Sequence, residues 1–196
     1  MPIAGLTALQ ALRAKGHLQP GKKVLINGAA GGIGTFAVQI ARSFGANVTG
    51  VCSTKNVELV RSLRADRVID YARDDFTQDS ERYDLLLDNV GNRTLLTMKR
   101  VLSPNGKCVM TRAAKELCAV FTRLLKAFAW PPLWRQKFKF FIANINRDDL
   151  TAFCGLIEAG KVTPVIDRRY PLAQTADVIM YVEEGHARAK VLITFQ

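Results

Sequence analysis

The 196-residue sequence predicts an α/β fold, a doubly wound parallel sheet of about six strands with helices on both faces. Short apolar runs alternate with segments of helical periodicity as far as residue 111, as in chains whose parallel strands are joined by crossover helices. The apolar runs are continuous, which is typical of strands covered on both faces. A glycine-rich turn separates the first run from the helix that follows it.

Turn residues and periodicity place the individual elements. Leu6, Leu9 and Leu12 recur at helical spacing and put a first helix within residues 1–20. The expected strands are residues 22–27, 47–52, 67–70, 84–88, 106–110 and 190–195, with an extended piece at 163–166. The other expected helices are residues 33–44, 57–63, 95–102, 148–159 and 172–182.

Composition indicates a globular chain without an export signal. No apolar run approaches the ~20 residues that span a bilayer, and the N-terminus lacks a basic segment followed by an apolar one. The four cysteines are far apart and form no Cys-x-x-Cys pair, so neither a metal site nor a disulfide framework is expected. Cys52 and Cys108 lie in strand-like runs, where we expect small buried hydrophobes. A cytoplasmic location with reduced thiols follows.

The net charge of +11 is unusual. A basic surface could attract nucleic acid, an anionic membrane or a polyphosphate cofactor. The excess is spread along the chain and accompanies no nucleic-acid-binding motif, so no nucleic-acid partner is expected. The favoured interpretation is an ordinary basic surface that helps an anionic cofactor to arrive.

The glycine-rich turn carries the clearest chemical signal. Residues 28–34 read Gly-Ala-Ala-Gly-Gly-Ile-Gly, a G-x-G-x-x-G pattern with Ala29 at its first position, between a strand and a helix. Gly31 would let the backbone approach a pyrophosphate, and Gly34 would let helix and strand pack closely. Amides of the helix's first turn would hold the negative charge. The pattern predicts a Rossmann dinucleotide site, although such a turn could also merely connect two elements. The expected pyrophosphate-binding residues are Ala29, Ala30, Gly31, Gly32, Ile33 and Gly34.

The end of the second strand favours NADP(H) over NAD(H). Enzymes that use NAD usually place an acid there to accept from the ribose 2′-hydroxyl. Here Ser53, Thr54 and Lys55 follow the strand, and no acid occurs before Glu58. These three side chains could donate to a 2′-phosphate. Lys55 could alternatively be a solvated surface lysine.

Two further turns follow strands at the edge where ligands of such sheets bind. Tyr71, after the third strand, could flank the adenosine. Asn89, Val90 and Gly91, after the fourth strand, could border the nicotinamide ribose. Tyr71 and Gly91 could instead be ordinary turn residues.

Several segments carry a family resemblance: residues 3–8 (Ile-Ala-Gly-Leu-Thr-Ala), 20–21, 24–34, 68–71 (Val-Ile-Asp-Tyr), 156–162, 170–172 and 183–187. The chain resembles the medium-chain dehydrogenase/reductase family, in its zinc-independent, quinone-oxidoreductase-like branch. The resemblance implies a six-stranded Rossmann sheet, NADPH as hydride donor, and reduction of quinones, enones or related carbonyls. It implies a sixth strand at residues 138–142, whose edge commonly pairs with a second subunit, and hence a homodimer.

The sequence also departs from the family. Members begin with a β-rich catalytic domain, and this chain starts near the point where that domain ends. We therefore expect a Rossmann domain at 1–146, a segment at 147–196 that returns to the catalytic domain in the family, and cofactor binding without useful turnover. Arg64 and Ala189 replace family glycines, and residues 111–114 replace a glycine-rich turn.

Other functions remain open beside the oxidoreductase. The chain could be a non-catalytic NADP(H)-binding module or subunit. The basic, aromatic segment at 112–139 has the amphipathic character of a helix that binds a membrane surface or a partner. Cover over the substrate cleft or a dimer face is the favoured interpretation of that segment. His17 and His186 are the only histidines, and no catalytic residue is identified.

Overall fold

The computed structural model describes residues 2–111, 135–184 and 188–195. Six parallel strands form one sheet in the order β3-β2-β1-β4-β5-β6. Their bounds are β1 (Lys23–Asn27), β2 (Asn47–Cys52), β3 (Arg67–Asp70), β4 (Tyr83–Asp88), β5 (Leu102–Met110) and β6 (Lys137–Phe140). The predicted Rossmann fold is confirmed. The strand order reverses between β1 and β4, which makes that crevice the topological switch point.

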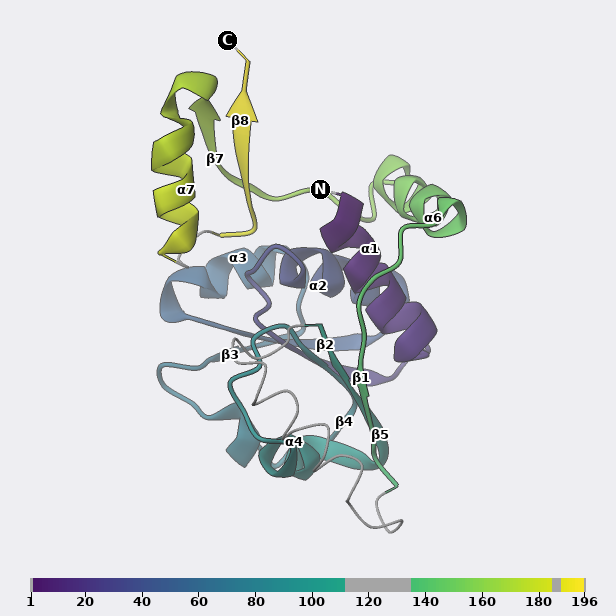
Figure 1. Ribbon diagram of the computed structural model, residues 1–196. Coiled ribbons are helices and arrows are strands. Elements are labelled where there is room, and N and C mark those ends of the chain that lie inside the picture. The colour runs from purple at the N-terminus through teal and green to yellow at the C-terminus, as the bar shows by residue number, and fades with distance from the viewer. Residues whose placement is uncertain (1, 112–134, 185–187, 196) are drawn as a thin grey trace.

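Helices cover both faces of this sheet (Figure 1). One face carries α1 (Pro2–Gln10), α2 (Gly34–Ser43), α3 (Val57–Ser62) and α6 (Arg147–Glu158), and the other carries α4 (Leu95–Val101). A wider π-type turn (Ala11–Lys15) continues α1 and closes with the Gly16 amide donating to the Ala11 carbonyl, 2.8 Å. The helix therefore ends near Gly16, within the predicted range of residues 1–20.

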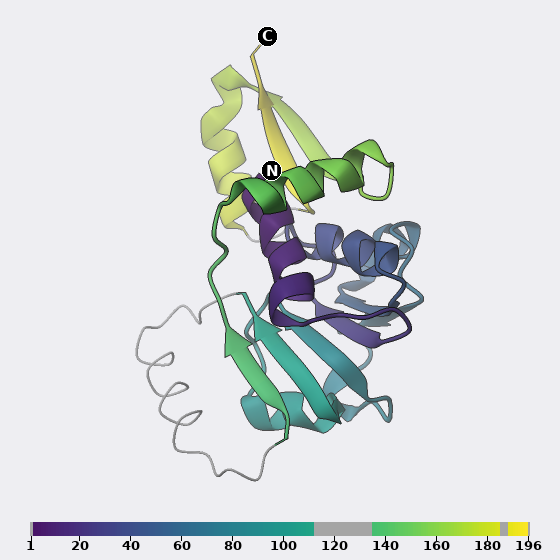
Figure 2. The same cartoon turned by 90° about the vertical axis from the view of Figure 1, so that its right-hand side faces the viewer.

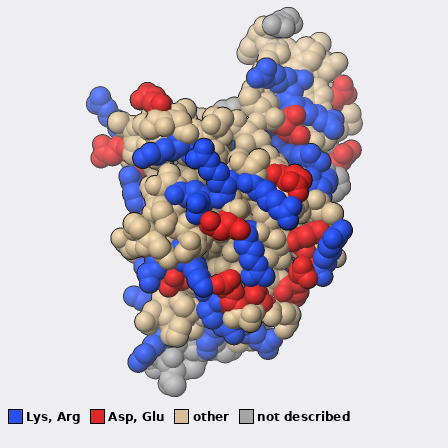
Figure 3. All heavy atoms as spheres, turned by 180° about the vertical axis from the view of Figure 1, so that it is seen from behind, with Lys and Arg blue, Asp and Glu red and all other residues tan. Residues whose placement is uncertain are grey.

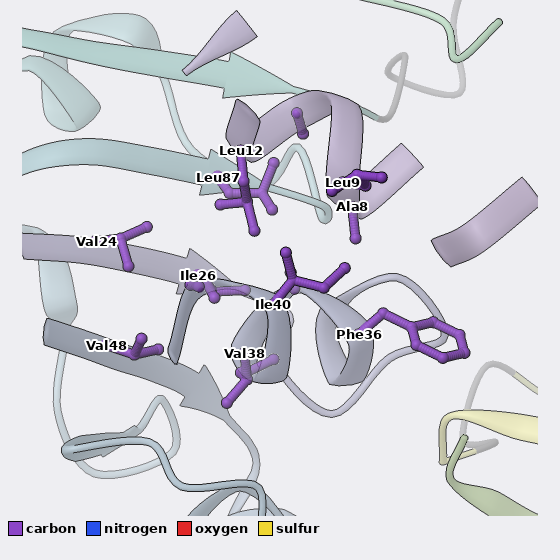
Figure 4. Packing of buried hydrophobic residues seen from close by; sticks show 14 of the residues in the cluster. Ala8, Leu9, Leu12, Val24, Ile26, Phe36, Val38, Ile40, Val48 and Leu87 are labelled. Atoms are coloured by element: carbon purple, nitrogen blue, oxygen red, sulfur yellow. The ribbon is translucent and has the colours of Figure 1, made fainter. Parts of the chain in front are cut away.

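Successive residues of the central strands point into different cores. Val24 and Ile26 of β1 pack among the residues of α1 and α2, as Figure 4 shows, whereas Leu25 packs in the second core beside Met98 of α4. Both sets are almost completely buried. This two-sided burial explains why the strands read as continuous apolar runs.

Helix α6 packs tightly across α1 (Figure 2). The Phe153 ring lies against Gly5, and a Cβ atom on Gly5 would overlap it. The same ring meets the Phe36 ring of α2 edge to face, with 5.4 Å between the ring centroids. Gln10 donates to Asp149 at 2.6 Å, and Arg13 forms an ion pair with the same carboxylate. The start of the predicted 147–196 segment thus shares the core of the Rossmann unit, and the division at 147 stays a prediction.

The C-terminal elements form a separate two-stranded parallel sheet with one helix. They are β7 (Ile166–Pro171), α7 (Thr175–Glu183) and β8 (Lys190–Thr194), and they project beyond the helical layer (Figures 1 and 2). The extended piece expected at 163–166 is wrong, because the strand begins at Ile166 and continues to Pro171. The charged residues Arg168 and Arg169 interrupt the apolar pattern by which a strand is predicted. The strand tolerates them because this sheet is half exposed.

The two residues that stand in place of glycines of the resembled family both have a left-handed backbone conformation. Arg64 has φ 70° and Ala189 has φ 54°. Arg64 ends α3, with its amide donating to the Arg61 carbonyl at 2.9 Å. The Ala189 amide donates to the Ala30 carbonyl at 2.9 Å. Left-handed conformation costs an L-residue about 1–2 kcal/mol, so these hydrogen bonds hold a strained backbone.

One face of the molecule carries charged side chains of both signs (Figure 3). On the face in Figure 3, lysine and arginine side chains are spread widely, with acidic side chains between them. Within the described ranges, no helix is long and apolar enough to cross a bilayer. The predicted amphipathic segment at 112–139 lies largely outside the described residues.

We predict that Phe153→Ala lowers the free energy of unfolding by about 3–5 kcal/mol, the usual range for removing a buried phenylalanine. The ring is 4% exposed and joins α6 to α1 and α2. Urea denaturation measures the change, with Leu96→Ala as control because that side chain is 53% exposed. Equal losses in the two variants would contradict this packing.

Candidate cofactor-binding site

A cleft of about 720 Å³ lies at the carboxyl edge of the sheet, over the switch point between β1 and β4. The loops after β1 to β5 and one residue of β8 border it. Its lining comprises Asn27, Gly28, Ala30, Gly31, Gly32, Ile33, Gly34, Cys52, Ser53, Lys55, Asn56, Tyr71, Phe76, Asn89, Val90, Asn92, Arg93, Thr111 and Lys190.

The glycine loop brings the N-terminus of α2 to the floor of the cleft. Gly28 has φ 79°, and its amide donates to the Val51 carbonyl at 3.1 Å. Gly34 touches the turn so closely that a Cβ atom would overlap the Gly28 carbonyl oxygen. A Cβ atom on Gly31 would meet only that oxygen, at 3.3 Å. Gly34 therefore serves helix packing, while Gly31 leaves the cleft side of the loop bare.

Most of the loop residues predicted from the sequence line the cleft. Ala29 does not: it is fully buried beneath the loop, where its Cβ atom faces Gly50 of β2. Its amide donates to the Val51 carbonyl at 2.9 Å. Ala29 thus supports the loop from below.

Beyond β2 and β3, Ser53, Lys55 and Tyr71 line the cleft and Thr54 does not. The Thr54 hydroxyl donates to the Asp70 carboxylate, which lowers the pKa of Asp70, and the Ala72 amide donates to the same group at 3.0 Å. Thr54 is therefore engaged with β3. These hydrogen bonds occupy the carboxylate of Asp70, which pairs in the sheet with Cys52, the residue before Ser53.

Beyond β4, Asn89 and Val90 line the cleft, whereas Gly91 lies outside the lining. The Val90 and Gly91 amides each donate to Asp88 Oδ1 at 3.1 Å, and Asn27 Nδ2 donates to it at 2.9 Å. Asp88 is 1% exposed. Its buried carboxylate holds the loop in place, as expected for a buried charge that accepts several hydrogen bonds.

Lys190 is a lining residue that sequence reasoning missed. A Cβ atom on Gly32 would lie 2.7 Å from Lys190 Nζ, so the ammonium group rests against the glycine loop. Burial lowers the pKa of Lys190. The neighbouring hydrogen bond from Ala189 to Ala30 anchors this segment. No local pattern in the sequence relates β8 to residues 28–34.

Arg93 is a second missed residue. It lies in the loop after β4, pairs with Asp75 at 3.1 Å, and places its guanidinium 5.7 Å from the Phe76 ring centroid. Nothing in the sequence indicated this role, because a single arginine in a polar turn is typical of an ordinary surface residue. The other missed lining residues are Asn27, Gly28, Cys52, Asn56, Phe76, Asn92 and Thr111.

The buried thiols have the character expected of hydrophobic side chains. Burial, with a smaller contribution from Asp70, raises the pKa of Cys52 to about 11. Burial also raises the pKa of Cys108. Both therefore stay protonated at neutral pH.

The charge of the lining suits a polyphosphate. Among the described lining residues, Lys55, Arg93 and Lys190 are basic and none is acidic. A helix N-terminus with amides facing a bare loop adds positive potential. The residues present thus fit a dinucleotide phosphate group. Across the part of the chain that the structure describes, no three His, Cys, Asp or Glu side chains gather as a metal-binding group.

Comparison with known proteins decides the family. The family model described as "Zinc-binding dehydrogenase" matches residues 63–193. The chain belongs to the medium-chain dehydrogenase/reductase family, in its quinone-oxidoreductase-like branch. This member is 33% identical to "NAD(P)H oxidoreductase RTN4IP1, mitochondrial" of Mus musculus, over 98% of this chain and 54% of the relative.

Two further matches agree. This dehydrogenase/reductase chain is 32% identical to "NADPH-dependent alkenal/one oxidoreductase, chloroplastic" of Arabidopsis thaliana, over 98% of this chain and 45% of the relative. Its fold matches the structure of the quinone oxidoreductase from Coxiella burnetii with a TM-score of 0.85 and 26% identity, covering 100% of this chain and 59% of that one. The chain thus spans about half the length of the curated relatives it matches.

We predict that Gly34→Ala lowers the free energy of unfolding by about 1–3 kcal/mol, as overpacking usually does. The new methyl group would collide with backbone, which has no rotamer to yield. Gly31→Ala is the matched control, because its methyl group meets one atom at 3.3 Å. Urea denaturation of both variants should separate them. If Gly31→Ala lost as much stability, the division of roles between these glycines would fall.

Proposed function

We propose that this chain is the NADP(H)-binding part of an oxidoreductase that transfers hydride from NADPH to a quinone, enone or related carbonyl. The observation that carries the proposal is the cleft's lining, which combines the glycine loop with three basic side chains and, among the described residues, no carboxylate. The names of two relatives agree with this proposal, since one is an NAD(P)H oxidoreductase and another an NADPH-dependent alkenal/one oxidoreductase.

The cofactor would span the switch point. Its pyrophosphate would lie at the N-terminus of α2, against Gly31 and beside Lys190. Its 2′-phosphate would accept hydrogen bonds from Ser53 and Lys55, with Tyr71 beside the adenosine. Ala29, Thr54 and Gly91 would support these contacts from outside the lining.

Hydride donation is the chemistry that the bound nicotinamide supplies, and the protein's part is to bind and orient it. Asn89 and Val90 border the half of the cleft on the β4 side, where the nicotinamide would lie. We further propose that the acceptor is a quinone, enone or related carbonyl, that catalysis needs no metal, and that the protein is cytoplasmic. Two relatives carry organelle names, mitochondrial and chloroplastic.

We predict that the unaltered chain binds NADPH more tightly than NADH, and that Lys55→Glu weakens NADPH binding about tenfold or more. A charge-assisted hydrogen bond is worth about 1.5–3 kcal/mol, and the new carboxylate would repel a 2′-phosphate. NADH affinity should change little. Fluorescence titration of both reduced cofactors measures this, with Lys161→Glu as control because Lys161 is exposed and outside the cleft. Superimposable NADPH and NADH curves for the unaltered chain would sink the NADP(H) assignment.

A homodimer is the second part of the proposal. Strand β6 is hydrogen-bonded to β5 alone and forms the edge of the described sheet. Phe140 is 45% exposed and Ile142, just beyond the strand, is 84% exposed. An unpaired edge that carries apolar side chains favours pairing with its copy.

We predict a dimer in sedimentation equilibrium, and a monomer for Ile142→Glu at the same concentration. The substitution would place two carboxylates at the symmetric edge. Ile3→Glu is the control, because Ile3 is 62% exposed and belongs to a helix, not to the sheet. A monomeric unaltered chain at high concentration would contradict pairing through β6.

A further inference from the structure

Asn89 and Thr111 form a polar pair at the β4–β5 end of the cleft. They directly follow the paired strand residues Asp88 and Met110, and both line the cleft. The Thr111 hydroxyl donates to Asn89 Oδ1 at 2.8 Å. The Thr111 amide donates to the Asp88 carbonyl at 3.1 Å, and the Asn89 amide donates to the Asn27 carbonyl at 3.2 Å. Hydrogen bonds thus hold the backbone of both residues and the oxygen of the Asn89 side chain.

Among the described residues, the nitrogen of the same carboxamide has no partner. Asn89 Nδ2 is buried and makes no hydrogen bond to any described residue. A buried donor without an acceptor costs free energy, and native proteins rarely keep one without a reason. Thr111 holds the oxygen of this side chain, and Asn89 lines the cleft, so a ligand bound there would be in place to supply the missing acceptor.

The strand order indicates which half of a dinucleotide would supply that acceptor. Ser53 and Lys55 follow β2, the glycine loop follows β1, and the Asn89–Thr111 pair follows β4 and β5. The sheet order β2-β1-β4-β5 therefore places the pair across the pyrophosphate site from the 2′-phosphate site. That is the nicotinamide side of a switch-point site.

We propose that Asn89 donates a hydrogen bond to an oxygen of the nicotinamide riboside half of the cofactor, and that Thr111 is the positioning residue that orients Asn89 for it. The inference rests on the proposed NADP(H) function. A glycine in place of Thr111 has no hydroxyl group, so a glycine-rich turn could not make the hydrogen bond that orients Asn89.

Two probes separate the halves of the site. NADPH carries the nicotinamide riboside, whereas adenosine 2′,5′-bisphosphate carries only the adenosine and the 2′-phosphate. Thr111→Val and Asn89→Ala should each weaken NADPH binding about three- to tenfold, the loss of one hydrogen bond. Affinity for the bisphosphate should not change, which also shows that the cleft is intact. Thr111→Ser keeps the hydroxyl group and should bind NADPH like the unaltered chain.

The double variant tests the positioning role. Because Thr111 acts through Asn89, the Thr111→Val and Asn89→Ala changes together should weaken NADPH no more than Asn89→Ala alone. Additive losses, unchanged NADPH affinity in the single variants, or equal losses for the bisphosphate would overturn the inference and leave the proposed function standing. If the unaltered chain did not bind the bisphosphate, the proposed function and this inference would both fall.

Discussion

The close approach of α2 to the turn after β1 is the constraint on which the rest of this structure depends. Gly34 permits it, because any Cβ atom there would overlap the Gly28 carbonyl oxygen. The contact directs the amide end of the helix into the crevice where the strand order reverses. Two other lining residues connect that loop to the rest of the site. Lys190 approaches it from β8, and Asn27, at the end of β1, ties it to the loop after β4 through Asp88.

The positive potential of the cleft depends on the local arrangement of charged side chains more than on the net charge of the chain. Three carboxylates directly precede residues that line the cleft, and each one is engaged within the protein. Asp70 accepts from Thr54, Asp75 pairs with Arg93, and Asp88 accepts from Asn27 and two loop amides. These acids shape the loops that border the cleft, while the basic groups of the lining come from three distant parts of the chain. Positive potential is thereby concentrated where a phosphate would lie.

Arg64 and Ala189 show how strongly the fold determines the backbone conformation. Both residues have a left-handed backbone conformation. Glycine adopts this conformation without strain, whereas a residue with a Cβ atom does not. At each position the surrounding hydrogen bonds decide the conformation. The Ala189 amide, bonded to the Ala30 carbonyl, joins the last strand to the glycine loop. The strain at Ala189 thus accompanies the contact that brings Lys190 to the cleft.

By itself, the sequence determined the alternation of strands and helices, the glycine loop at the N-terminus of α2, and the lack of an acid directly after β2. Each of these is a local pattern, in which burial or hydrogen bonding imposes a period or a residue type over a few positions. Only the tertiary structure decided which side chains share the cleft. Lys190 of β8 and Arg93 of the loop after β4 reach it from distant parts of the chain, and Thr54 does not line it, because its hydroxyl donates to Asp70. Which side chains line the cleft depends on hydrogen-bond partners that only packing brings within reach, so no local sequence pattern could predict it.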